Sequence, residues 1–277
     1  AVVEVPTVAL DLASFASVHE FSAHLRDGGQ PIDVLCLNAG RGGAAHDKAE
    51  LTVDKNEAIM QVNLLSHALL VHELLPNLRK SEYVRIVAHS SSARSNVDPS
   101  LVDDLAGRRR GANPWRQYSL TKAGLCLLMR ALNERLAQAG VTGVASVADP
   151  GLAATGVNVQ HDLARTLGMW RRGIKDTKAF HNKAGSHAAD AALPMALAAL
   201  EGRPNALYMG EGSTSTTLDG AAHRAGSLLW RDEPRAADPM NWPAESVQRL
   251  WRAVGAIIGV KGSHDELPAP GQGHDEL

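Results

Sequence analysis

Aromatic side chains are scarce in this chain of 277 residues, since phenylalanine, tryptophan and tyrosine together make up 4% of it. Apolar residues still account for 44%, so aliphatic side chains and alanines must fill the core. The only two cysteines, Cys36 and Cys126, are too few for a disulfide framework. Because both lie in apolar segments, we expect buried thiols. The 12 histidines show no metal-ligand spacing, which argues against a metal site.

An excess of charge of either sign is also missing. The chain carries 28 basic and 30 acidic residues, a net charge of −2. This balance gives no basic footprint for nucleic acid, so we expect no nucleic-acid partner. The sequence contains no apolar run of 18 residues, and we therefore expect no membrane span.

The two ends of the sequence carry opposing signals about location. The last four residues, 274–277, read His-Asp-Glu-Leu, an address for return to the endoplasmic reticulum, but the same four letters occur at 264–267. The duplicate suggests a tandem repeat within a flexible tail at 261–277. No signal or transit peptide opens the sequence. The endoplasmic reticulum lumen is thus one expectation, and the cytoplasm or another organelle is the alternative.

Between the ends, strand and helix patterns alternate. Strands are expected at 2–10, 32–37, 84–88, 141–147 and 206–209, and helices begin near residue 14 and cover 51–78, 117–139, 185–200 and 243–258. The run 32–37 is continuously apolar, as in a strand buried on both faces of a parallel sheet. This alternation predicts an α/β fold with a mostly parallel sheet. Residues 1–260 are expected to form one domain.

One pair of residues suggests chemistry. Tyr118 and Lys122 are four positions apart in a helical segment, so their side chains share one face. A phenol has a pKa of about 10, and a neighbouring ammonium lowers it. Tyr118 would then exchange a proton with a carbonyl or an alcohol. Taken alone, so short a motif is more often an ordinary exposed tyrosine with a solvated lysine, and only its companions in the sequence reverse this interpretation.

The pair has companions in a defined order. Asn38-Ala39-Gly40, Asn63, the serines at 90–92, Tyr118 with Lys122, Pro150-Gly151 and Thr155 together resemble the short-chain dehydrogenase/reductase family. The resemblance covers about 10–259. It is closest to the branch of retinol dehydrogenases, WW-domain oxidoreductases and protochlorophyllide reductases, because of the segments 101–105, 183–185 and 247–251. It implies a doubly wound, Rossmann-like sheet with helices on both faces.

The resemblance also implies roles for four catalytic residues. Tyr118 would be the acid/base, and Lys122 would lower the pKa of Tyr118 and hold the cofactor ribose. Ser91 would position the substrate oxygen, although Ser90 or Ser92 could take that place and the serines could merely cap a loop. Asn63 would hold a water beside Lys122, the alternative being an asparagine that bonds its own helix.

The implied cofactor is NADP or NAD. Asn38, Ala39 and Gly40 would line its adenosine side, and Asp11 would lie near the adenine or simply cap a helix. Pro150, Gly151 and Thr155 would meet the nicotinamide, and Lys122 the ribose. The branch acts on lipophilic carbonyls and alcohols. A substrate lid would cover 158–183, whose positive charges we interpret as a solvated helix face.

One family feature is missing from the sequence. No Thr-Gly-x-x-x-Gly-x-Gly turn, which would hold the cofactor pyrophosphate at a helix N-terminus, precedes the first expected strand. Two main explanations remain open. The sequence is a fragment of an ordinary oxidoreductase, or it is an inactive structural subunit whose exposed sheet edge is covered in a larger assembly. A non-enzymatic nucleotide-binding scaffold is a third. The intact set of Asn63, Ser91, Tyr118 and Lys122 favours the first. Family members also often form homo-oligomers.

Overall fold

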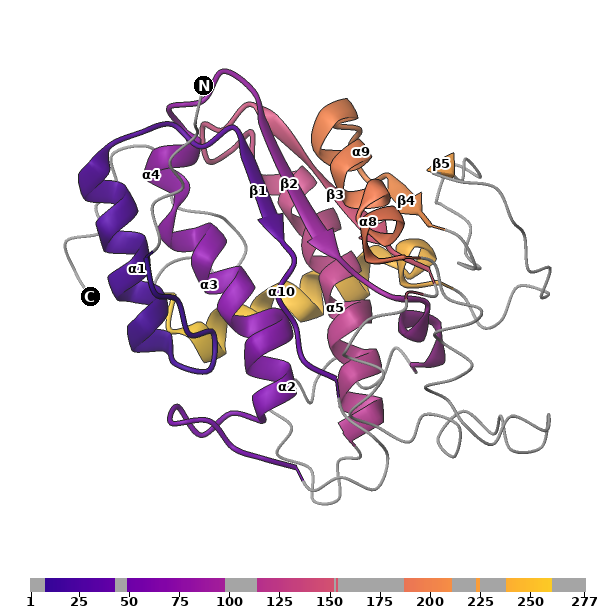
Figure 1. The fold of residues 1–277 in the computed structure, drawn as a ribbon. Coiled ribbons are helices and arrows are strands. Elements are labelled where there is room, and N and C mark those ends of the chain that lie inside the picture. The colour runs from indigo at the N-terminus through magenta and orange to yellow at the C-terminus, as the bar shows by residue number, and fades with distance from the viewer. Residues whose placement is uncertain are drawn as a thin grey trace, which may run out of the picture.

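A parallel β-sheet forms the centre of the computed structural model, which describes residues 8–42, 49–97, 114–151, 153, 187–210, 223–224 and 238–260. Its strands are β1 (Val34–Leu37), β2 (Val84–His89), β3 (Gly143–Asp149), β4 (Leu207–Met209) and β5 (His223–Arg224). They lie side by side in the order of the sequence, and every neighbouring pair is parallel. The predicted α/β fold with a mostly parallel sheet is confirmed (Figure 1).

The strand side chains alternate between two cores of unequal size. Ile86 and Ala88 of β2 belong to the larger cluster, whereas Val87 between them belongs to a small cluster of five buried residues on the opposite face. The same alternation separates Leu207 from Tyr208 in β4. This period of two is what a sheet covered on both faces requires.

The larger core lies beneath the helices α1 (Phe15–Gly28), α3 (Ser66–Glu73), α5 (Pro114–Arg135) and α10 (Ala244–Ile258). The helix predicted near residue 14 is confirmed, because Ser14 caps α1 by accepting a hydrogen bond from the backbone N–H of Ser17. Gly29 ends α1 in the left-handed conformation, with φ of 68°. In Figure 1, α10 crosses behind α5, and the two helices are in contact.

The helix expected over 51–78 is shorter and broken. Residues 51–57 form a turn closed by an antiparallel bridge between Leu51 and Glu57. Four segments follow: α2 (Ala58–Met60), the π-helical η1 (Gln61–Leu65), α3 and α4 (Leu75–Leu78). Pro76 occupies the first turn of α4, where its missing N–H is tolerated, and this explains the break before α4.

The opposite face of the sheet is covered by α9 (Leu193–Glu201), against which the short helix α8 (Ala188–Ala191) packs. They replace the single helix expected over 185–200, since Pro194 begins a new helix. Expected helix 117–139 corresponds to α5, and expected helix 243–258 corresponds to α10, whose N-cap is Pro243.

The first strand contradicts the expectation of burial on both faces. Only Leu37 of β1 is buried, Val34 is 41% exposed, and Cys36 is exposed rather than buried. The reason is position: β1 stands at the edge of the described sheet and pairs only with β2. Cys126, by contrast, is buried in α5 as expected.

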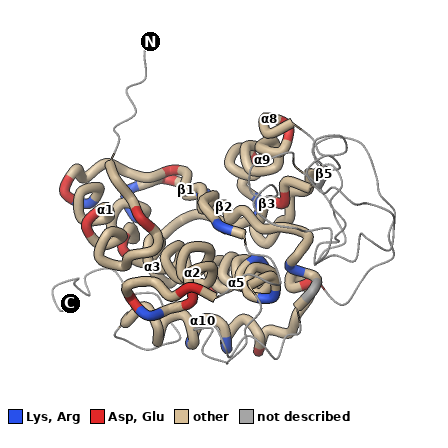
Figure 2. The backbone as a smooth tube through the Cα atoms, turned by 60° about the horizontal axis from the view of Figure 1, so that its bottom comes forward, with Lys and Arg blue, Asp and Glu red and all other residues tan. Residues whose placement is uncertain are grey.

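Several predictions fall partly or wholly outside the described residues. These are most of the strand at 2–10, the branch segment at 101–105, the lid at 158–183 and the tail at 261–277; residues 8–10 form no strand. No helix in the described ranges is long and apolar enough to cross a membrane, and no cluster of metal-binding side chains occurs there. Figure 2 shows acidic and basic positions interspersed along these elements.

Candidate active site

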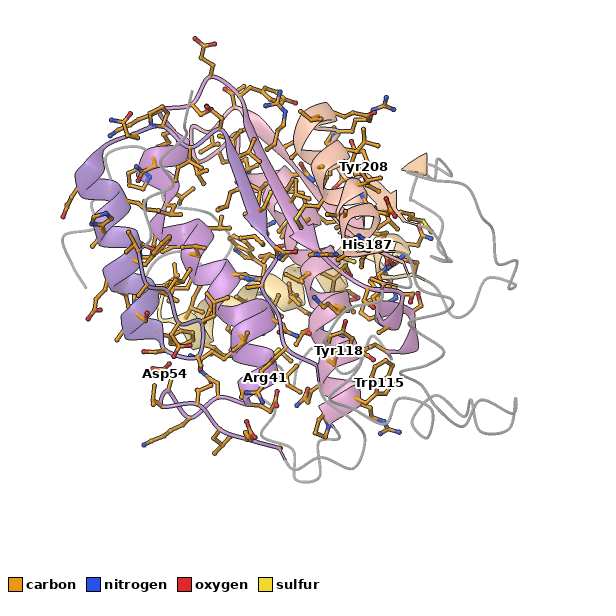
Figure 3. The ribbon with its side chains drawn as sticks, in the orientation of Figure 1. Arg41, Asp54, Trp115, Tyr118, His187 and Tyr208 are labelled. Atoms are coloured by element: carbon orange, nitrogen blue, oxygen red, sulfur yellow. The ribbon has the colours of Figure 1, made fainter. Side chains whose placement is uncertain are left out.

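The proposed catalytic residues meet where the sheet strands end. Ser91 follows β2 and caps the short 3-10 helix η2 (Ser92–Asn96), Tyr118 and Lys122 lie on one face of α5, and Asn63 lies in η1. Figure 3 shows Tyr118 on the part of α5 beyond the carboxyl ends of β1 and β2. Ligands bind at this edge in open α/β sheets.

Of the three serines, Ser91 is the one that contacts the tyrosine. The Ser91 side chain makes a hydrogen bond with the Tyr118 side chain. Ser90 is buried and donates to the Lys122 carbonyl at 2.8 Å, and Ser92 is exposed. On its other side the Tyr118 ring stacks on Trp115, with 5.6 Å between the ring centroids. The phenol is thus fixed between a hydroxyl and an indole.

Lys122 is buried, and its ammonium points to the end of β2. Its Nζ donates to the His89 carbonyl at 2.7 Å and lies 5.6 Å from the centre of the Tyr118 ring. Burial lowers the pKa of Lys122 to about 8, although the Asp149 carboxylate opposes this shift. Lys122 therefore loses its proton more readily than a solvated lysine.

The expected lowering of the Tyr118 pKa is wrong for this structure. Burial raises the pKa of Tyr118, and the nearby Asp149 carboxylate adds to the rise, while the hydrogen bond with Ser91 opposes it. The Lys122 ammonium lies over the ring face and is bonded to a carbonyl, so it does not offset the burial of the phenol. Tyr118 is consequently a protonated phenol at neutral pH.

Asn63 is fully buried and joins two segments outside its own helix. Its Oδ1 accepts from the backbone N–H of Arg41 at 2.8 Å, and its Nδ2 donates to the Arg41 carbonyl at 2.9 Å and to Thr121 Oγ1 at 3.2 Å. The π-helical turn that contains Asn63 was not predicted; such turns often occur at functional sites. The amide ties the turn after β1 to α5.

The expected cofactor residues after β1 are more open. Asn38, Ala39 and Gly40 are all exposed. Gly40 is close to the catalytic residues, because a Cβ atom added there would lie 3.2 Å from Asn63 Oδ1 and 3.5 Å from Lys122 Nζ. The Asn38 side chain contacts His89, with 2.5 Å between Oδ1 and Nδ1.

The remaining cofactor candidates belong to other segments of the chain. Pro150 and Gly151 follow β3, and Gly151, with φ of 71°, donates its N–H to Asp149 Oδ1 at 2.9 Å. Asp11 is exposed and accepts from the backbone N–H of Ala13 at 2.8 Å, so it shapes the approach to α1 without being its cap. Thr155 lies outside the described residues.

A buried charge cluster behind the site was missed from the sequence. Arg94 is fully buried and pairs with Asp149 and, at 3.1 Å, with Asp238. Arg94 follows Ser91 by three residues, and Asp149 precedes Pro150, so the cluster joins two loops of the site to the C-terminal segment. The only available signal was the acidic residue before the Pro-Gly turn.

With this geometry established, similarity to known proteins defines the family. Residues 2–165 match the model of the short chain dehydrogenases, and the chain belongs to this family. It is 35% identical to retinol dehydrogenase 13 of Homo sapiens over 148 residues, which is 53% of this chain and 42% of that protein. Protochlorophyllide reductase B of Hordeum vulgare is 35% identical over 115 residues, covering 38% of this chain and 29% of that protein. These relatives place the chain in the predicted branch.

A longer alignment exists with retinol dehydrogenase 13 of Mus musculus, at 28% identity over 96% of this chain and 70% of that protein. Among solved structures, an uncharacterized protein from Mycobacterium Paratuberculosis has a TM-score of 0.58 and 24% identity, covering 94% of this chain and 75% of that one. A short-chain dehydrogenase from Streptomyces avermitilis has a TM-score of 0.50 and 20% identity, covering 73% and 68%. These two structures support the Rossmann-like fold.

Proposed function

We propose that this chain is an NAD(P)(H)-dependent oxidoreductase that interconverts a lipophilic carbonyl and the corresponding alcohol. The observation that carries the proposal is the contact of Ser91 with Tyr118 beside the buried Lys122. Family membership and relatives named retinol dehydrogenase and polyprenol dehydrogenase support the reaction class and the lipophilic substrate. No relative named here supports the alternative of an inactive structural subunit.

The residues around Lys122 fit a dinucleotide. Gly40 lacks a side chain at the point where a Cβ would approach Asn63 and Lys122, which leaves the strand end accessible. Lys122 can offer ammonium protons to ribose hydroxyls, and Asn38 to Gly40 and Pro150-Gly151 follow the ends of β1 and β3. These residues would bind the adenosine and nicotinamide sides, respectively. None of them replaces the Gly-rich pyrophosphate turn.

The chemistry of the site follows from proton positions. A bound nicotinamide would give or take the hydride. Tyr118, which keeps its proton at neutral pH, would donate that proton to the carbonyl oxygen, and Ser91 would hold the same oxygen by a hydrogen bond. The Lys122 ammonium, close to the ring, would stabilise the phenolate that remains. Asn63 would keep the loop at Arg41 and helix α5 in register.

The test compares Tyr118→Phe with the wild type. We expect NADPH- or NADH-dependent reduction of a long-chain or isoprenoid aldehyde to fall by about 10²-fold to 10⁴-fold, as for loss of a general acid. Tyr83→Phe is the matched control, because Tyr83 lies far from the site and donates only to the Gly202 carbonyl at 3.4 Å. Full turnover by Tyr118→Phe would refute the assigned role. A wild-type protein that binds neither dinucleotide would favour the structural subunit.

A further inference from the structure

His89, the last residue of β2, touches both the cofactor side and the catalytic side of the site. Its backbone carbonyl accepts the hydrogen bond from Lys122 Nζ at 2.7 Å. Its ring Nδ1 lies 2.5 Å from Asn38 Oδ1 in the turn after β1. Since Lys122 lies on α5 and Asn38 follows β1, this one residue connects three separate elements at the carboxyl edge of the sheet.

The ring of His89 is held in one protonation state. Burial lowers the pKa of His89 to about 4, and the nearby Lys122 ammonium acts in the same direction while Asp149 opposes it. The imidazole is therefore neutral at physiological pH. Because an amide oxygen only accepts hydrogen bonds, the single ring proton lies on Nδ1 and is donated to Asn38. Nε2 then carries no proton. It is buried and has no hydrogen-bond partner among the described residues.

A second contact holds the same turn from its other end. Asn63 bonds both backbone groups of Arg41, three positions after Asn38. Asn38 to Gly40 are otherwise exposed, so these two side chains fix a short segment that lacks packing of its own. Asn63 reaches the turn from η1 and His89 reaches it from β2. The elements that carry the catalytic residues therefore also fix the position of this turn.

We propose that His89 is a positioning residue that holds the Asn38–Gly40 turn in register with Lys122, so that both ends of a dinucleotide meet preformed contacts. This inference rests on the proposed function. Its physical basis is preorganisation: a turn that is already ordered costs less to bind a ligand than a free one. The expected effect is on cofactor affinity, with the chemical step largely preserved, since His89 does not contact Tyr118 in the described structure.

The first measurement needs no cofactor. Long-range ¹H–¹⁵N spectra of the imidazoles should show His89 as the Nδ1-protonated tautomer, without titration above pH 5. Asn38→Ala should release this tautomer preference, because it removes the acceptor. A His89 that carries its proton on Nε2, or that titrates near pH 6.5, would overturn the proposed link. This readout is independent of whether the protein binds NAD(P)H.

The second measurement uses dinucleotide affinity in three variants. His89→Leu should raise the Kd of NADPH or NADH about tenfold while kcat changes less than threefold. His89→Asn should recover affinity to within about threefold of the wild type, because its amide N–H replaces Nδ1 as the donor. Asn38→Ala should raise the Kd as much as His89→Leu does. The Kd of the double variant should be no higher than that of either single variant.

The outcomes separate the two proposals. Wild-type affinity in His89→Leu, or multiplicative losses in the double variant, would overturn the positioning role while leaving the oxidoreductase function intact. Loss of kcat with unchanged Kd would also overturn it. A wild-type protein that binds no dinucleotide would refute the proposed function itself, and the tautomer measurement would still decide whether His89 fixes the turn. Should His89→Leu not fold, Asn38→Ala and His89→Asn keep the same comparison.

Discussion

The two sides of the candidate site differ in how they are held. On the catalytic side, Asn63 and Lys122 are buried, and each makes hydrogen bonds to other elements. On the cofactor side, Asn38, Ala39 and Gly40 are exposed and follow the edge strand β1. Buried polar groups must be paired, and their pairing fixes them in place. The catalytic side is therefore built into the core, whereas the cofactor side depends on two side-chain links.

The largest expected effect comes from breaking the catalytic side at its buried charge cluster. Arg94→Met should lower the free energy of unfolding by about 3–5 kcal/mol, because it leaves the Asp149 and Asp238 carboxylates buried without their cation. Urea denaturation followed by circular dichroism measures this loss. Arg203→Met is the matched control, since its ion pair with Glu201 is exposed and should contribute less than about 1 kcal/mol. Equal losses in both variants would contradict the structural role of Arg94.

The next-largest expected effect is a loss of stability in acid, caused by the buried His67 on the catalytic side. Burial lowers the pKa of His67 to about 3, and the Lys122 ammonium adds to this. The unfolded chain, whose histidines have a pKa of about 6.5, binds more protons than the folded one below that pH. Stability should thus be complete above pH 6.5 and fall as the pH drops towards 3, by at most about 1.4 kcal/mol per pH unit for His67.

His67→Leu tests this explanation of the acid sensitivity. The variant cannot bind a proton at that position, so its free energy of unfolding should fall less steeply between pH 6.5 and 4 than that of the wild type. Urea titrations at matched pH values give the two slopes. Parallel slopes would mean that His67 does not remain neutral in the folded protein.

The sequence predicts those features of the site that depend on contacts between neighbouring residues. The i, i+4 spacing of Tyr118 and Lys122 on one helix and the alternation of strands with helices depend on neighbouring residues, and both are found as expected. Contacts between distant segments were not predictable. The Arg94 cluster joins residues 144 positions apart, and the π-helical turn at Asn63 has no periodic signature.

The errors have a common physical origin as well. The apolar run at β1 indicates a buried strand, but burial depends on which neighbours the sheet supplies, and β1 lies at its described edge. The pKa of Tyr118 likewise depends on the balance between desolvation and charge, which the spacing of two residues does not reveal. Local pattern predicted the helical pair Tyr118 and Lys122, and the family resemblance supplied their companions Asn63 and Ser91, whereas the environments of these residues required the packed structure.

A smaller effect is expected where the two sides approach each other. Gly40→Ala would place a methyl group 3.2 Å from Asn63 Oδ1, so Asn63 or the turn must shift by a few tenths of an ångström. We expect turnover to fall about tenfold with little change in stability, because positioning errors weaken catalysis before they unfold a loop. Gly255→Ala is the matched control, because a Cβ added at this position in α10 meets nothing within 4 Å. Similar turnover in both variants would show that the approach to Asn63 tolerates a side chain.

The smallest expected effect is a difference in maleimide labelling between the two cysteines, one on each side of the site. Cys126 is buried in α5, and burial raises the pKa of its thiol to about 12, so it should not react with a maleimide in the folded protein. Cys36 on β1 is exposed and should be labelled at pH 8, even though partial burial raises the pKa of its thiol. Mass spectrometry of labelled peptides distinguishes the two sites.

One label at Cys36, without loss of stability, confirms an open cofactor edge. Protection of both cysteines until urea is added would show that another segment or a second chain covers β1, and the contrast between the two sides would then disappear in the assembled protein.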